Sequence, residues 1–295
     1  MRQSVSFYSG DHLLAGDLYL PEGFAPGEAR PAIVLCNGYT ATKDLYLPET
    51  AAALNRAGYI VLSFDYTGWG ESEGPRNRLA PFGRVMDTHA AVTFLGLQPS
   101  ADQTRVGVLG WSYGGATAIW LAATDERLKC AVSIGGVGDG ARWMRSVREA
   151  DEWAGLLARS VNDRAARVLD GRSGLASRPE ILKLDPESAR ISAQARRGSK
   201  GAADEIPLAF VDETLAFNPE WVVDRISPRA VLLVTGEIDL IVLPAEAEAL
   251  YAHAGEPKKL SVIEGAGHYD LYTGEAFDKV MSETIAWFGE HLGQA

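Results

Sequence analysis

The stretch that decides the fold covers residues 106–115 and reads VGVLGWSYGG. Its first four residues predict a buried strand, and apolar residues at helical spacing follow over residues 113–123. Ser112 stands between the two, with Gly110 two residues before it and Gly114 two residues after it. So sharp a turn strains the backbone of the serine, and small neighbours avoid a collision. We therefore expect the Ser112 hydroxyl to project from the carboxyl end of a strand.

The rest of the chain alternates strands and helices in the same way. An antiparallel pair is expected at residues 4–8 and 13–20. Runs typical of strands buried on both faces follow at residues 32–36, 59–65, 106–109, 131–134, 230–235 and 259–263. Helical spacing covers residues 44–57, 81–97, 113–123, 244–253 and 275–292. This order predicts an α/β fold with a mostly parallel eight-stranded sheet and helices on both of its faces.

Residues 140–226 interrupt the alternation, because they contain no buried-strand run. Apolar residues recur at helical spacing from Trp143 to Val168 and predict one long or broken helix, with a bend at Gly155 and a stop at Gly171. Further short helices are expected to start at Arg178-Pro179, Asp185-Pro186 and Asn218-Pro219. We therefore divide the chain into a core domain, residues 1–139 and 227–295, and a helical cap, residues 140–226.

Composition and charge limit the classes of function. The chain has 295 residues, of which 46 % are hydrophobic, and a net charge of −11, which argues against nucleic acid or an anionic membrane surface as a partner. Cys36 and Cys130 are too few for a disulfide framework or a cysteine-ligated zinc site. The first ten residues lack the apolar stretch of a secretory signal, and no run has the length of a membrane span, so we expect a cytoplasmic protein. A homodimer is only the base-rate expectation.

The predicted cap differs from the rest of the chain in charge. Residues 141–200 hold 13 Lys or Arg against 8 Asp or Glu. The favoured interpretation is a solvated helical face. The alternative is a basic entrance for anionic substrates, with Arg142 and Arg145 as the candidates to meet the anion.

A serine hydroxyl is a weak nucleophile at neutral pH, so it needs a general base and a carboxylate that orients this base. Of the five histidines, only His268 is expected in a loop just after a core strand, among small residues. Asp239 also follows a core strand, and Glu237 and Asp139 are its rivals for the role of the carboxylate. We predict Ser112, Asp239 and His268 as the catalytic residues.

With Ser112, Asp239 and His268 in this chain order, the sequence resembles the α/β-hydrolases with a helical cap. The likeness is to their dienelactone-hydrolase and X-Pro dipeptidyl-peptidase branches. Residues 65–72, DYTGWGES, are similar to the D-x-x-G-x-G-x-S turn after the fourth strand of these proteins. We interpret this turn as structural, with Trp69 as a residue that could reach the pocket.

The resemblance also implies an oxyanion hole. Asn37-Gly38-Tyr39 stands where the family has His-Gly-x after its third strand. By that match the backbone N–H groups of Tyr39 and Tyr113 stabilise the negative oxygen of a tetrahedral intermediate. The asparagine at position 37 leaves these two donors intact and changes the packing behind the loop.

These residues predict a serine hydrolase that cleaves a carboxylic ester or lactone of a small-molecule acyl substrate through an acyl-enzyme on Ser112. No dinucleotide fingerprint and no cluster of metal ligands is found in the sequence, so we expect neither a cofactor nor a metal. An amidase or peptidase, a carbon–carbon hydrolase or a hydroxynitrile lyase would use the same triad, and these alternatives stay open. So does a non-catalytic ligand sensor on the same fold.

Substrate choice is expected to depend on large side chains near the serine and in the predicted cap. The candidates for substrate binding are Trp111, Trp143, Met144, Trp153 and Phe210.

Overall fold

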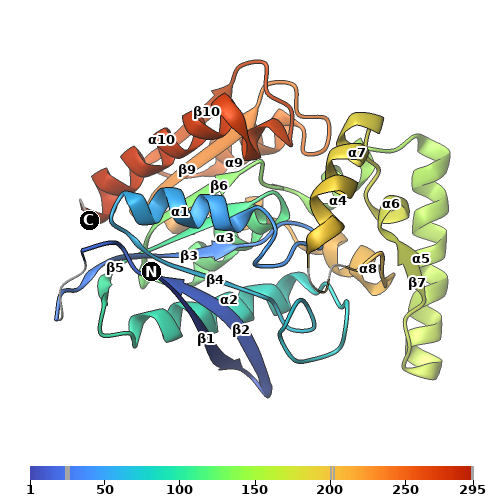
Figure 1. Cartoon of the computed structure of the whole chain (residues 1–295). Coiled ribbons are helices and arrows are strands. Elements are labelled where there is room, and N and C mark those ends of the chain that lie inside the picture. The colour runs from blue at the N-terminus through green and yellow to red at the C-terminus, as the bar shows by residue number, and fades with distance from the viewer. Residues whose placement is uncertain (24–26, 200, 202, 294–295) are drawn as a thin grey trace.

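One sheet of eight strands lies at the centre of the computed structural model, which describes residues 1–23, 27–199, 201 and 203–293 (Figure 1). The strand order is β1-β2-β4-β3-β5-β6-β9-β10. The pairs β1–β2 and β2–β4 are antiparallel, and the pairs from β4–β3 onward are parallel. The strands are β1 Arg2–Ser9, β2 His12–Tyr19, β3 Arg30–Cys36, β4 Ile60–Phe64, β5 Ala101–Trp111, β6 Leu128–Ile134, β9 Ala230–Gly236 and β10 Lys258–Ile263. The mostly parallel sheet expected from the sequence is confirmed.

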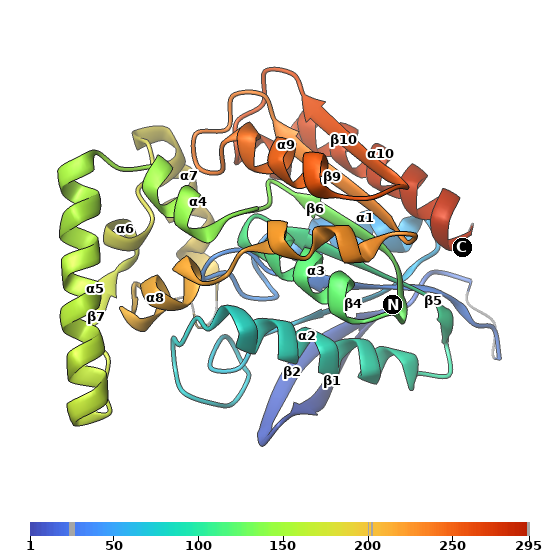
Figure 2. The same ribbon diagram turned by 180° about the vertical axis from the view of Figure 1, so that it is seen from behind.

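Helices cover both faces of the sheet (Figures 1 and 2). On one face lie α1 Leu47–Arg56 and α10 Gly274–Leu292. On the other face lie α2 Pro81–Gly96, α3 Tyr113–Thr124 and α9 Pro244–His253. Successive strand residues therefore enter different cores: Ile33 and Leu35 belong to the first core, and Ala32 and Val34 to the second. Strands covered on both faces must be apolar at every position, which explains the continuous apolar runs.

A single residue makes the turn from β5 to α3. β5 ends at Trp111 and α3 begins at Tyr113, so Ser112 alone reverses the chain direction, with φ 54° and ψ −125°. This region of backbone space is strained for a residue with a side chain, at a cost of about 1–3 kcal/mol. A Cβ atom on Gly110 would lie 2.0 Å from the carbonyl oxygen of Gly114. The turn therefore forms only because position 110 carries no side chain.

Residues 140–226, here called the helical segment, connect β6 to β9. Helices α4 to α8 lie at one end of the sheet, with α5 outermost (Figures 1 and 2). The helices are α4 Gly140–Ser146, α5 Ala150–Asp170, α6 Arg178–Ile181, α7 Pro186–Ala195 and α8 Ala209–Leu215, with short 3-10 helices η1 Arg196–Gly198, η2 Pro219–Trp221 and η3 Val223–Ile226. A further 3-10 helix, η4 Asp270–Tyr272, belongs to the sheet domain. Proline opens α6, α7 and η2, as predicted.

The long amphipathic helix predicted in this segment is broken between α4 and α5. Glu149 forms a capping box with Glu152 at the start of α5, and Gly171, with φ 70°, ends it. The predicted stop at Gly171 is confirmed, whereas the bend expected at Gly155 is wrong, because α5 continues through that residue.

The sequence analysis missed one feature of the helical segment, a pair of short antiparallel strands. β7 Leu175–Ser177 and β8 Glu205–Pro207 form a separate two-stranded sheet. Each strand has three residues, of which only the central one, Ala176 or Ile206, is buried. One apolar residue gives no recognisable run, so these strands carry no signal of the kind that predicted the others. No helix in the described residues is long and apolar enough to cross a membrane.

The close contact at Gly110 predicts that Gly110→Ala lowers the free energy of unfolding by about 3 kcal/mol or more, because the new methyl group meets rigid backbone. The matched control is Gly155→Ala in the exposed middle of α5, where a Cβ atom has no neighbour within 4 Å. This change should raise the free energy of unfolding by about 0.5–1 kcal/mol. Urea unfolding followed by circular dichroism measures both. Equal effects of the two substitutions would contradict the account of the turn.

Candidate active site

The fold brings Ser112, His268 and Asp239 into one hydrogen-bonded chain. Ser112 Oγ lies 3.0 Å from His268 Nε2, and His268 Nδ1 lies 2.6 Å from Asp239 Oδ2. The serine and the histidine are 156 residues apart in the chain, and the histidine and the aspartate are 29 apart. They meet because all three follow the carboxyl ends of strands, namely β5, β9 and β10. The histidine and aspartate side chains are only 5 % and 0 % exposed.

The aspartate determines which imidazole nitrogen carries the proton. Its Oδ1 atom accepts hydrogen bonds from the N–H groups of Ile241, at 2.8 Å, and Val242, at 2.9 Å, so the carboxylate is held in place. A carboxylate only accepts, so Nδ1 of His268 donates to Asp239. The other nitrogen, Nε2, is then free to accept the hydroxyl proton of Ser112. This is the arrangement that a general base next to a nucleophile requires.

The two rival carboxylates lie elsewhere. Glu237 is exposed and accepts the N–H of Gly265 at 2.8 Å. Asp139 caps α4 by accepting the N–H groups of Ala141 and Arg142 and also binds the amide of Asn218 at 2.7 Å. Both carboxylates therefore stabilise loops, and the structure places neither beside His268.

The loop that follows β3 lies directly against the serine. A Cβ atom on Gly38 would be 3.4 Å from Ser112 Cβ and 4.0 Å from its Oγ, so the backbone at positions 38 and 39 borders the hydroxyl. Tyr113, the other residue expected in the oxyanion hole, is the first residue of α3. Backbone N–H groups at the start of a helix have no partner within the helix and favour negative charge. The two predicted donors thus belong to segments that adjoin Ser112, the loop after β3 and the start of α3.

A buried arginine holds this loop from behind. Arg84, on α2, is 4 % exposed and donates to the carbonyl oxygens of Asn37 and of Gly38, the latter at 3.1 Å. The carbonyl of Gly38 and the N–H of Tyr39 belong to one planar trans peptide, so they point in opposite directions. By holding the carbonyl oxygen of Gly38, Arg84 orients the N–H group of Tyr39 away from the guanidinium group.

The asparagine that replaces the family's histidine has a structural partner. Asn37 is 1 % exposed, and its Nδ2 donates to the carbonyl oxygen of Phe64, at the end of β4, at 2.8 Å. The turn over residues 65–72 is structural as well: Asp65 accepts the N–H groups of Lys43 and Glu71. Trp69 is buried and donates to the carbonyl of Arg78, and it is not among the residues that line the cavity at Ser112.

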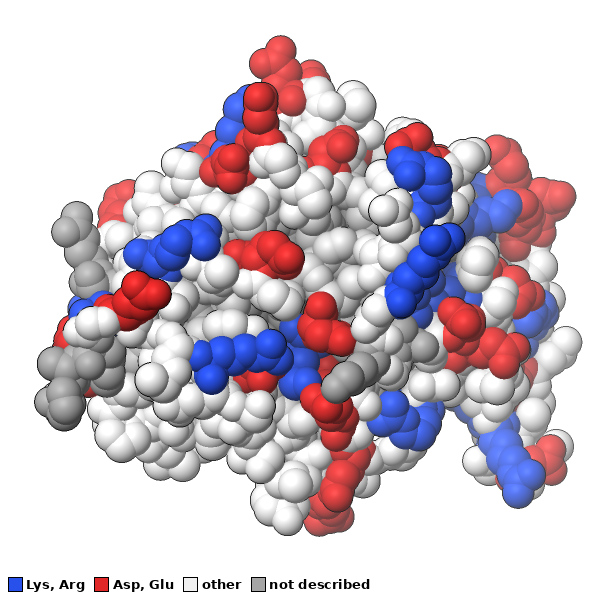
Figure 3. All heavy atoms as spheres, viewed as in Figure 1, with Lys and Arg blue, Asp and Glu red and all other residues white. Residues whose placement is uncertain are grey.

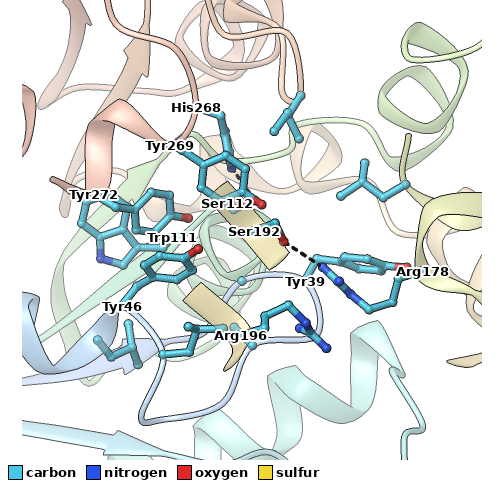
Figure 4. Close-up of a pocket in the computed structure, with 16 residues that line it drawn as sticks. Tyr39, Tyr46, Trp111, Ser112, Arg178, Ser192, Arg196, His268, Tyr269 and Tyr272 are labelled. Atoms are coloured by element: carbon cyan, nitrogen blue, oxygen red, sulfur yellow. Dashed lines mark hydrogen bonds between the residues drawn. The ribbon is translucent and has the colours of Figure 1, made fainter. Parts of the chain in front are cut away.

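A cavity of about 40 Å³ lies against Ser112 and His268 (Figure 4). Tyr46, Tyr269 and Tyr272 stand on one side of the serine, and Tyr39 and Arg178 on the other (Figure 4). This volume holds only a few water molecules, whereas sites for small-molecule substrates measure roughly 300–1,000 Å³. The lining side chains must therefore move when a substrate enters. The remaining lining residues are Gly38, Ala41, Leu45, Leu47, Trp111, Leu182, Ser192, Arg196 and Ile241.

The phenols of this cavity are neutral. Burial raises the pKa of Tyr39, Tyr46 and Tyr272 above the ordinary value of a phenol, and for Tyr272 the neighbouring Ser112 hydroxyl opposes the shift. Tyr272 also stacks on Trp111, with ring centroids 4.4 Å apart. Sequence reasoning named Tyr39 only for its backbone N–H and missed Tyr46 and Tyr272, although position 272 lies four residues after His268.

The structure places the predicted substrate contacts in different surroundings. Trp111 lines the cavity, but the lining residues include none of Trp143, Met144, Trp153 and Phe210. Three of these, Trp143, Met144 and Phe210, are each 1 % exposed. Trp143 and Phe210 pack against the rings of Tyr39 and Tyr113, so they form the core that supports the site. Trp153 lines a separate surface hollow together with Arg142 and Arg145. Large apolar side chains entered the core because burial of their area stabilises the fold.

Arg142, one of the two arginines named in the alternative interpretation as anion contacts, has carboxylate partners. Its guanidinium pairs with Glu220 and with Glu246, the latter at 2.7 and 2.9 Å, so its charge is already compensated by two carboxylates. Glu246 is 2 % exposed and also accepts the N–H groups of Gly138 and Asp139. The group joins the start of the helical segment to α9 and is not among the residues that line the cavity at Ser112. No group of three or more histidine, cysteine or acidic side chains within the described residues is placed to hold a metal ion.

Comparison with known proteins identifies the family of the chain. The sequence profile of the serine aminopeptidase S33 family matches residues 27–272. The chain therefore belongs to the serine aminopeptidase S33 family of α/β hydrolases, and it is an α/β-hydrolase enzyme. The resemblance drawn from the sequence is confirmed for the α/β-hydrolases as a whole, and the two narrower branches stay a prediction.

The alignments with three similar proteins cover nearly the whole chain. An uncharacterized 31.7 kDa protein of the traX-finO intergenic region of Escherichia coli is 31 % identical over 286 residues, which cover 96 % of this chain and 99 % of that protein. A protein named Thiohydrolase from Eupenicillium brefeldianum is 27 % identical and covers 97 % of this chain and 93 % of its own. The crystal structure of the α/β hydrolase GrgF from Penicillium sp. sh18 superposes with a TM-score of 0.82 at 24 % identity and covers 99 % of both chains. This structural likeness supports the fold.

The ion pairs of Arg142 predict a structural role for this side chain. Arg142→Met should lower the free energy of unfolding by about 2 kcal/mol, because it removes charged hydrogen bonds and leaves Glu246 buried without its cation. The matched control is Arg172→Met, which removes the same charge from an exposed position after α5 and should change stability by less than about 0.5 kcal/mol. Urea unfolding measures both. Unchanged stability of the Arg142 variant, with an altered preference for charged substrates, would restore the interpretation that we reject.

Proposed function

We propose that this protein is a serine hydrolase that cleaves a carboxylic ester or lactone of a small molecule through an acyl-enzyme on Ser112. The observation that carries the proposal is the hydrogen-bonded chain from Ser112 through His268 to Asp239. It supplies a nucleophile, a base in the required tautomer and a carboxylate that orients the base. Residues 140–226 form the cap over this site in our proposal, because α6, α7 and η1 supply lining residues.

The residues act in the following order. Nε2 of His268 takes the hydroxyl proton as Ser112 Oγ attacks the carbonyl carbon, and Asp239 stabilises the imidazolium that forms. The N–H groups of Tyr39 and Tyr113 stabilise the oxyanion of the tetrahedral intermediate. His268 then gives its proton to the leaving alcohol. Water attacks the acyl-enzyme by the same route, with His268 again as the base, and releases the carboxylic acid.

A thioester is a second candidate for the bond that is cleaved. A relative with 27 % identity over nearly the whole chain carries the name Thiohydrolase. The triad chemistry is the same for both substrates, because a thiolate is only a different leaving group. Turnover rates of matched substrates with an ester, thioester, lactone or amide bond show which of these bonds the enzyme cleaves, and so also test the amidase alternative. Carbon–carbon cleavage and cyanide release, measured on a β-diketone and a cyanohydrin, test the other two reactions.

Substitution of the triad tests the proposed function. Ser112→Ala and Asp239→Asn should each lower kcat for the best substrate of this panel by roughly 10⁴-fold or more, because the nucleophile or the imidazole tautomer is lost. Glu237→Gln removes the rival carboxylate two residues earlier and should leave kcat within about twofold of the parent. Stopped assays of initial rate give the values, and circular dichroism confirms the fold of each variant. Near-parental turnover by Ser112→Ala, or a large loss in Glu237→Gln alone, would refute the assignment.

The contact of Arg84 with the loop at Gly38 gives a separate prediction. Arg84→Met should lower kcat by roughly tenfold to a hundredfold and leave KM within about threefold, because the Tyr39 N–H is displaced from the oxyanion while substrate contacts persist. Affinity for a boronic acid, which forms a tetrahedral adduct on the serine, should fall by the same factor. Arg84→Lys keeps one charged donor and should restore part of kcat. If kcat falls only in proportion to the fraction of folded protein, and the affinity for the boronic acid is unchanged, the role of Arg84 is purely structural.

A further inference from the structure

Two arginines of the helical segment line the cavity beside Ser112 without a carboxylate partner. Arg178 belongs to α6 and Arg196 to η1. Arg178 donates to the hydroxyl oxygens of Thr40, at 2.7 Å, and Ser192, at 3.4 Å. Arg196 donates to the carbonyl oxygens of Thr40, at 3.1 Å, and Ala203, at 2.6 Å, and also to the Thr40 hydroxyl. All these acceptors are neutral, and within the described part of the chain neither guanidinium forms an ion pair with an acidic side chain.

The positive charge of this pair is therefore uncompensated. Burial, followed by the repulsion of Arg178, lowers the pKa of Arg196 to about 10, and the attraction of Asp204 is too weak to restore it. Both arginines are half-buried. Two like charges held together at a partly buried site are costly unless an anion binds between them or beside them. Basic side chains are also visible on the surface over the region of α7, next to this site (Figure 3).

The hydroxyl groups of two tyrosines, Tyr39 and Tyr46, are buried beside the same cavity and have unused hydrogen-bond capacity. Tyr39 is 7 % exposed, and neither its hydroxyl oxygen nor that of Tyr46 has a hydrogen-bond partner within the described residues. The guanidinium of Arg178 lies 5.8 Å from the centre of the Tyr39 ring. A buried hydroxyl without a partner is unfavourable, and each of these phenols can donate to an acceptor that enters the cavity. Figure 4 shows Tyr39, Arg178 and Arg196 around the serine.

We propose that Arg178 and Arg196, with the hydroxyls of Tyr39 and Tyr46, form a subsite for a carboxylate of the substrate next to Ser112. This inference rests on the proposed function and names its substrate class: an ester, thioester or lactone that carries a second, ionised carboxyl group. The planar guanidinium groups match the two oxygens of a carboxylate, and the phenols supply neutral donors. The basic entrance, which the sequence left as the alternative to a solvated helical face, is thereby assigned to different arginines from the two named there.

Two pairs of substrates test the subsite and locate the anion. In the first pair, p-nitrophenyl hydrogen adipate carries a carboxylate on the acyl part, and p-nitrophenyl hexanoate is its neutral partner. In the second pair, para-acetoxybenzoate carries it on the leaving group, and para-acetoxybenzamide is the neutral partner. The carboxylate member of at least one pair should have a kcat/KM at least tenfold higher than its partner. The pair that shows the preference identifies the side of the scissile bond that the subsite binds.

Substitutions then connect the preference to the two arginines. Arg178→Met and Arg196→Met should each lower the ratio of the two kcat/KM values by roughly tenfold to a hundredfold, mainly through KM, as expected for the loss of a charged hydrogen bond. Arg172→Met removes the same charge from an exposed site and should leave the ratio within about twofold. Arg178→Lys and Arg196→Lys keep the charge and should retain part of the preference. A merely structural role would instead lower the rates of charged and neutral substrates equally.

The outcomes separate this inference from the proposed function. Ser112-dependent hydrolysis with no preference for the carboxylate in either pair would overturn the subsite and leave the serine hydrolase intact. The same holds if the preference survives both methionine substitutions. If no substrate is hydrolysed, calorimetry of monomethyl adipate binding decides. Binding to the parent protein that is lost in both methionine variants supports the subsite. No binding to the parent protein, or equal binding to the parent and the variants, overturns it. Hydrolysis that survives Ser112→Ala would refute the proposed function instead.

Discussion

The close approach of three backbone segments at Ser112 is the constraint on which the rest of the site depends. The turn from β5 to α3 has room for only one residue, and Gly110 and Gly38 allow the neighbouring segments to pack against it. The strain at Ser112 is kept because strands and helices on both sides over-determine the position of the turn. Backbone hydrogen bonds from the Ser112 N–H to the carbonyl of Ile134, at 2.7 Å, and from the Gly115 N–H to the carbonyl of Ser112, at 2.8 Å, hold the turn as well. The same rigidity places the imidazole of His268 at 3.0 Å from the hydroxyl oxygen.

The triad residues lie between a negative charge on the sheet side and positive charges on the side of the helical segment. On the sheet side, Asp239 is buried and held by two backbone N–H groups, which keeps a negative charge behind the imidazole. On the side of the helical segment, Arg178 and Arg196 face the cavity with neutral partners. In a chain with a net charge of −11, two cations without an ion-pair partner among the described residues thus lie beside the site. A substrate with an anionic group would be drawn to this wall and its carbonyl brought toward the serine.

The sequence predicted the sheet and the triad because both have local signals. Buried strands read as apolar runs, and Ser112, Asp239 and His268 each lie in the turn or loop that follows such a run. The residues of α6, α7 and η1 that line the cavity have no such signal, since their position depends on how the helical segment packs against the sheet domain. Large side chains such as Trp143 and Phe210 were candidates for substrate contacts but lie in the core. Arg142, one of the two arginines of the alternative interpretation, is paired with Glu220 and Glu246. Side-chain type alone does not distinguish a core aromatic from a lining one, or a paired arginine from one that faces a cavity.

The most direct test of the account is the site of covalent labelling by a fluorophosphonate, identified by mass spectrometry of peptides from the folded protein. The account predicts one phosphonylated side chain, at position 112, and loss of this label when His268 is replaced by alanine, because the hydroxyl then lacks its base. A folded protein that is not labelled at position 112 would contradict it and favour a ligand sensor. Labelling at the parental rate in the alanine variant would contradict it as well.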